Sequence, residues 1–148
     1  MHILVENISL AELEFEVYPE NAENLSYGLH VTCRDHYPED NLLMQVVTFD
    51  LMHEIEKPAF KLRFSFISQF RSEGEGEPTL KEFAKFNAPA YVVPYARELV
   101  SNVTSRAGVI PTLVIPPINV FALLKGIRDD FEQPDLGLDE HIPDDESE

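Results

Sequence analysis

The side chains that could bind a metal or act as a nucleophile are few and scattered along the sequence. The five histidines are His2, His30, His36, His53 and His141. No two of them have the HxH or HxxxH spacing that brings two imidazoles to one metal ion. The single cysteine, Cys33, continues an apolar alternation, which favours a small core residue over a nucleophile. The sequence therefore predicts no metal site and no intramolecular disulfide.

No sequence motif for phosphate, dinucleotide or acyl chemistry occurs in the chain. The G-x-S-x-G, P-loop and G-x-G-x-x-G patterns are all absent. The glycines Gly74 and Gly76 alternate with carboxylates, which would repel a phosphate group. We therefore expect a protein that is not an enzyme and needs no cofactor, and the remaining candidate chemistry is charge and apolar surface.

The charge pattern is strongly acidic. The chain of 148 residues carries 27 Asp and Glu against 11 Lys and Arg, a formal net charge of −16. Such a field argues against nucleic acid and anionic membrane surfaces as partners. Glu12, Glu14 and Glu16 alternate with apolar residues, so they share one face of a strand. A basic partner would fit this face, and a merely solvated surface is the alternative.

Aromatic residues are abundant, with ten Phe, five Tyr and no Trp. They gather in the second half of the predicted sheet and in the predicted helices. A plain core accounts for most of them. An excess beyond that core on a small charged domain indicates a partner or an oligomer.

Four strand-like segments come first in the sequence. Apolar residues alternate over 11–17, 25–33 and 60–66, and residues 42–52 are partly apolar on both faces, which indicates a central strand. The alternation changes phase between Leu10 and Ala11, which predicts a bulge or bend. Residues 36–41 have turn chemistry. Short links between successive strands favour an antiparallel sheet.

Helices follow the strands. Thr79 and Glu82 form a capping-box pattern that opens a short helix. A longer helix is predicted over 91–107 and ends at Gly108. Near its start, Pro94 is interpreted as suiting a first helical position. Residues 109–117 are expected to be extended, and Asn119 to cap a last helix. Strands followed by helices predict an α+β fold, with a four-stranded antiparallel sheet followed by two to three helices.

The chain is predicted to form one domain over residues 1–128, followed by an acidic and disordered tail over 129–148. Met1 and His2 lead directly into strand-like sequence, so no signal peptide is expected. The apolar runs are far shorter than about twenty residues, which excludes direct membrane insertion. Together with the lone cysteine, these features favour the cytoplasm.

The segment Asn87–Leu124 resembles the C-terminal half of the SecB family of preprotein-export chaperones. The matching residues are PYARE from Pro94, followed in order by Ser105-Arg106, Gly108, Pro111, Leu113, Pro117, Asn119 and Ala122-Leu123. The resemblance extends more loosely over about residues 3–128, where Glu12–Glu16 resembles the acidic first strand of the family. It implies a homotetramer built as a dimer of dimers, which holds unfolded preproteins without ATP and delivers them to the SecA translocase.

The resemblance also suggests site residues. The candidates for a hydrophobic client-binding groove are Tyr27, Leu29, Val31, Phe49, Phe64, Phe66, Phe83, Phe86 and Tyr91. The candidates for a translocase-binding face are Glu12, Glu14 and Glu16, and those for an oligomer interface are Tyr95, Leu99 and Val103.

Two departures from the family pattern concern the translocase. Arg63 stands where the family tends to add a glutamate to the docking face, and the acidic tail does not follow the family's C-terminus. The first alternative is therefore a SecB-like chaperone for other clients, such as an aggregation-prone antitoxin. The second alternative is an interaction adaptor with no unfolded client, and an enzyme is the third.

Overall fold

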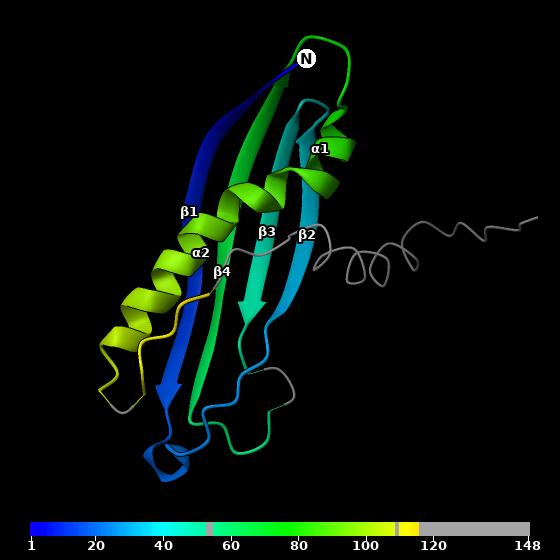
Figure 1. The fold of residues 1–148 in the computed structure, drawn as a ribbon. Coiled ribbons are helices and arrows are strands. Elements are labelled where there is room, and N and C mark those ends of the chain that lie inside the picture. Colours follow the sequence, from blue (N-terminus) through cyan, green and yellow to red (C-terminus); the bar gives the residue numbers. More distant parts are fainter. Residues whose placement is uncertain (53–54, 109, 116–148) are drawn as a thin grey trace, which may run out of the picture.

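The computed structural model describes residues 1–52, 55–108 and 110–115 (Figure 1). Four strands are β1 (His2–Val17), β2 (His30–Glu39), β3 (Leu42–Asp50) and β4 (Phe60–Glu73), and the helices are α1 (Leu80–Phe86) and α2 (Ala88–Ser105). A 3-10 turn, Pro19–Asn21, follows β1. The strands form one antiparallel sheet in the order β1-β4-β3-β2. The predicted α+β class and four-stranded antiparallel sheet are confirmed, and the strand predicted to be central over 42–52 is β3.

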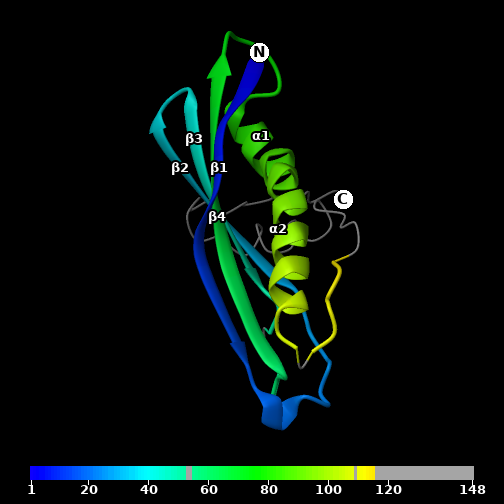
Figure 2. The ribbon, with the colours of Figure 1, turned by 90° about the vertical axis from the view of Figure 1, so that its left-hand side faces the viewer.

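Both helices lie on one face of the sheet, and α2 crosses it diagonally toward β1 (Figures 1 and 2). Because successive side chains of a strand point to opposite faces, β4 divides into two sets. Phe60, Leu62 and Phe64 are buried on the face that carries the helices, which we call the helix face. Lys61 and Arg63 lie on the other side, which we call the open face.

The core lies between the sheet and the helices in two clusters. The larger one packs Val92, Ala96 and Val100 of α2 against the aromatic residues of β3 and β4. There Phe49 and Phe64 stack with ring centroids 5.0 Å apart. The smaller cluster lies under α1, where Phe70 of β4 meets Phe83 edge to face at 5.1 Å. This packing fixes the positions of both helices on the sheet.

Strand β1 contains two irregularities in its pairing with β4. The shift between Leu10 and Glu12 confirms the bulge predicted from the phase change of the apolar alternation. A second shift, between Val5 and Asn7, was not predicted, because polar residues there leave no apolar alternation to read. Strand β2 also differs from the prediction, since it begins at His30 and continues to Glu39 through most of the segment predicted as a turn.

The capping box of α1 is present, with Thr79 accepting a hydrogen bond from the Glu82 backbone and Glu82 accepting one from Thr79. The interpretation of Pro94 as a first helical position is wrong, since α2 (predicted over 91–107) begins at Ala88 and Pro94 lies inside it. Proline in a helix removes the hydrogen bond to the carbonyl four residues earlier. That residue is Ala90, which is exposed, so its carbonyl can bond to water instead.

Gly108 ends the helical segment with a φ of 74°, a left-handed conformation that favours glycine. Residues 110–115 then run back alongside α2 (Figure 2). The last helix predicted from Asn119 and the acidic tail predicted over 129–148 lie outside the described residues.

Candidate functional site

An apolar surface runs along the boundary between β1 and α2 on the helix face. Tyr95 of α2 packs on Phe66 of β4, and Leu10 of β1 is the strand partner of Phe66 on its other side. Tyr91 and Val5 flank Phe70 in the same way. Leu13, the strand partner of Phe64, continues the row. We call the exposed members the apolar flank: Val5, Leu10, Leu13, Tyr91 and Tyr95.

The apolar flank is about half exposed at every position. The exposed fractions are 44% for Val5 and Leu10, 46% for Leu13 and Tyr91, and 47% for Tyr95. In the described part of the structure β1 is an edge strand, so its outer backbone groups add unpaired donors and acceptors to this surface. The β1 residues are not among the candidates predicted from the sequence, because their alternation is that of an ordinary half-buried strand.

Most candidates for the client groove lie in the core. Val31, Phe49, Phe64, Phe66 and Phe83 are buried, and Leu29 packs partly against the larger cluster. Only three candidates are exposed on the surface of this structure: Tyr27, Phe86 and Tyr91. Phe86 at the end of α1 and Tyr91 at the start of α2 lie close in sequence, whereas Tyr27 precedes β2. The structure therefore does not bring the nine candidates together as one groove.

The oligomer candidates form one stripe along α2 but differ in burial. Tyr95 belongs to the apolar flank, while Leu99 and Val103 are partly buried against the larger cluster. One turn apart, these three side chains make a stripe that is half covered by the chain's own sheet. A partner would have to cover the remainder.

The translocase candidates Glu12, Glu14 and Glu16 do share the open face of β1, opposite two cations of β4. Glu14 and Glu16 are strand partners of Arg63 and Lys61. The Lys61 Nζ lies 3.0 Å from a carboxylate oxygen of Glu14, and this hydrogen bond raises the pKa of Lys61 above its ordinary value. The row of three carboxylates is therefore largely compensated by charges on the neighbouring strand.

Negative charge on the open face near the start of β1 is likewise compensated by a cation of β4. The Arg71 guanidinium donates to Glu6 at 2.6 Å and to Glu39 at 3.3 Å, which raises the pKa of Arg71. Gln69 donates to the other oxygen of Glu6 at 2.7 Å. Glu6 lies at the irregularity of β1 between Val5 and Asn7, so this network fixes the irregular segment of the edge strand to β4 and β2.

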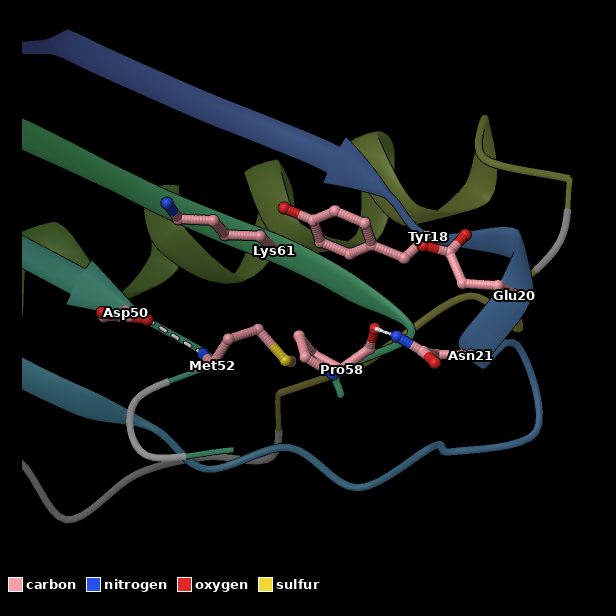
Figure 3. Close-up of a pocket in the computed structure, with 7 residues that line it drawn as sticks. All are labelled: Tyr18, Glu20, Asn21, Asp50, Met52, Pro58 and Lys61. Carbon is pink, nitrogen blue, oxygen red and sulfur yellow. Dashed lines mark hydrogen bonds between the residues drawn. The ribbon is translucent and has the colours of Figure 1, made fainter. Parts of the chain in front are cut away.

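An open pocket lies near the ends of β1 and β3, with Tyr18, Met52 and Pro58 among its lining residues (Figure 3). Its polar groups are occupied by structural contacts. The Asn21 side chain donates to the Pro58 carbonyl at 3.1 Å, and Asp50 accepts from the Met52 backbone at 2.9 Å. Glu20, Asp50 and Lys61 also line it. The Tyr18 hydroxyl donates to Glu16 at 3.1 Å and Lys61 pairs with Glu14, so these two groups also make contacts with β1.

Within the described residues, no three His, Cys, Asp or Glu side chains are placed to hold a metal ion. The helices of that same part of the chain are too short or too polar to cross a membrane. The candidate functional surface is thus apolar and lies on the helix face, while several charged side chains of the open face form ion pairs with one another.

A solved structure has the same fold. The α+β architecture of this chain is shared with a solved SecB-like chaperone from Mycobacterium tuberculosis, Rv1957, which was determined in complex with a ChAD peptide from the antitoxin HigA1. The match has a TM-score of 0.63 and 20% identity, covering 79% of this chain and 91% of the other. At that identity the likeness establishes the fold.

The sequence itself establishes the family. The family described as preprotein translocase subunit SecB matches residues 3–128, and the chain therefore belongs to the SecB family. An uncharacterized protein of Methanocaldococcus jannaschii, MJ0357, is 25% identical over 119 residues, which are 78% of this chain and 76% of that protein. The predicted family is confirmed, and with it the coarse assignment to the chaperones.

Proposed function

We propose that this protein is an ATP-independent holding chaperone that binds unfolded polypeptides and acts as a homotetramer in the cytoplasm. The observation that carries the proposal is the apolar flank. Burying exposed aliphatic and aromatic surface is favourable by about 25 cal/mol per Å², and the partner need have no particular sequence. An unfolded chain supplies such partners, because its apolar side chains are exposed.

The apolar flank has two kinds of members, and we assign them to two roles. The β1 members lie on an edge strand, where backbone hydrogen bonds can join two copies of the chain. Of the α2 members, Tyr91 lies with Phe86 at the junction of α1 and α2; these two of the three exposed groove candidates are assigned to client binding. Tyr95 lies between the two regions and, as the sequence analysis expected, is assigned to the oligomer interface.

The test is a holding assay with the full chain. The protein should suppress aggregation of a chemically denatured polypeptide at a near-stoichiometric ratio, and ATP should change nothing. Tyr91→Ser with Phe86→Ser should weaken suppression, whereas Val114→Ser, which removes an exposed apolar side chain elsewhere, should not. A chain that binds only native proteins would instead be an adaptor, and one that binds neither would end the proposal.

Delivery to a SecA-type translocase is the finer form of this proposal, and it depends on the open face. Three carboxylates of β1 could dock a basic surface, as the family resemblance implies. Neighbouring strands are about 4.8 Å apart and residues rise about 3.3 Å along a strand, so Arg63 lies within one Debye length, about 10 Å, of all three carboxylates, and Lys61 lies within it of Glu14 and Glu16. Their positive charge lowers the field that a basic partner would meet.

This compensation favours a second candidate function, a SecB-like chaperone for clients outside the export pathway. The known complex of Rv1957 with an antitoxin peptide shows that a chaperone of this fold can have such a client. Binding of a SecA-type motor at low ionic strength distinguishes the two. Binding by the parent chain supports export, and binding only after Lys61→Gln and Arg63→Gln supports the second candidate.

A further inference from the structure

The extended segment Ile110–Ile115 follows α2 and lies alongside it; we call this segment the strap. It is held to α2 through its backbone, as a bound peptide in an extended conformation would be. Three α2 side chains bind its backbone. Thr104 Oγ1 accepts from the Leu113 N–H at 2.9 Å, Ser101 Oγ donates to the Leu113 carbonyl at 3.1 Å, and Arg97 Nε donates to the Ile115 carbonyl at 2.9 Å.

All three of these hydrogen bonds are made to backbone atoms of the strap, so they do not depend on its side chains. Residues 97, 101 and 104 are spaced four and three apart, so they form one row along α2. Thr104 is fully buried, and its own hydroxyl donates to the Val100 carbonyl, which fixes the hydroxyl as an acceptor toward the strap. Such a row would bind the backbone of any extended polypeptide laid in the same place.

The side chains of the strap divide into inward and outward sets. Ile110 and Ile115 are buried in the larger core cluster, and Leu113 packs partly against it. Thr112 and Val114 are exposed, Val114 by 66%. The place occupied by the strap therefore offers apolar sites for three aliphatic side chains, at positions i, i+3 and i+5 of an extended segment. The residues between them face outward.

We infer that the row Arg97, Ser101 and Thr104 is a binding site for extended apolar polypeptide, occupied by the strap in the resting chain and by a client segment in the complex. The inference rests on the proposed holding function and adds a second client-binding location, further along α2 than the junction that holds Phe86 and Tyr91. A tethered segment competes at an effective concentration of roughly millimolar or less. Clients then bind with an apparent Kd equal to the intrinsic Kd divided by the fraction of chains with a displaced strap.

Hydrogen exchange on the parent chain tests the displacement directly. The probe is a reduced and alkylated polypeptide that cannot refold, added at saturation, with binding confirmed by light scattering. The backbone amides of residues 110–115, including the bonded Leu113 N–H, should lose protection when the probe binds. Binding with unchanged or increased protection overturns only this inference, whereas absence of any binding overturns the holding function as well.

Two matched variants test the competition. Ile115→Ala removes a buried anchor of the strap, and Val114→Ala removes a neighbouring side chain that faces outward. If the strap is displaced in few molecules, the first variant should lower the apparent Kd for the probe by about fivefold or more, and the second should leave it unchanged. The contradicting result is a folded Ile115→Ala protein in which the amides of residues 110–115 exchange freely, yet whose apparent Kd for the probe is equal to or higher than that of the parent chain.

Discussion

Disruption of the β1 part of the apolar flank should dissociate the oligomer without unfolding the chain. Leu10 and Leu13 are 44% and 46% exposed, so about half of each side chain is already buried in the protomer. Burying the other half is worth about 1 kcal/mol per leucine. A two-fold interface contains four such leucines, or about 4 kcal/mol, which corresponds to roughly a thousandfold in the dissociation constant.

The perturbation is the double variant Leu10→Lys and Leu13→Lys, which also sets like charges across the two-fold axis. Light scattering across a range of micromolar concentrations should show a tetrameric parent and a smaller variant with unchanged circular dichroism. Leu25→Lys, at an exposed position between β1 and β2, is the matched control and should remain tetrameric. A folded double variant with the parent's mass refutes the assigned interface, and a monomeric parent refutes the oligomer itself.

Three further predictions concern the core and the open face. Phe70→Ala should lower the free energy of unfolding by about 3–5 kcal/mol in urea titration, because it empties the smaller cluster; a loss below about 1 kcal/mol would contradict that packing. Leu99→Glu should dissociate or unfold the protein, since a carboxylate facing the core costs several kcal/mol; an unchanged mass and melting curve would show that the stripe is not covered. Glu12→Gln with Glu16→Gln should weaken binding of a SecA-type motor and its salt dependence while client holding persists; equal affinity would exclude the face as a docking site.

How far the sequence predicts the fold depends on whether a feature is local. The capping box of α1 and the bulge after Leu10 were predicted correctly, because each depends on neighbours in the chain. The start of α2 was not, since Pro94 fits a first helical position by its own geometry. Only the tertiary structure shows that the helix begins at Ala88, before Pro94, and that Ala90 is exposed.

The candidate site is less predictable than the fold, because exposure depends on which strand becomes an edge. Phe64 and Leu13 both alternate with charged residues, and only the strand order makes the first buried and the second exposed. The row of Arg97, Ser101 and Thr104 could not be found from sequence either. The three residue types are ordinary in a helix. They form a candidate site only because the segment 110–115 returns along α2 and places its backbone within hydrogen-bonding distance of them.

The net charge of −16 is a weak guide to the partner of this protein, since it is distributed unevenly. Ten of the 27 acidic residues and two of the 11 basic ones follow Ile115, so residues 1–115 carry only half of the net charge. On the open face, two carboxylates are strand partners of Lys61 and Arg63. A screened field acts over about one Debye length, so a docking partner responds to this nearly balanced local set of charges. The acidity of the whole chain therefore supports solubility more directly than it supports translocase docking, and the motor-binding experiment has to be made on this face.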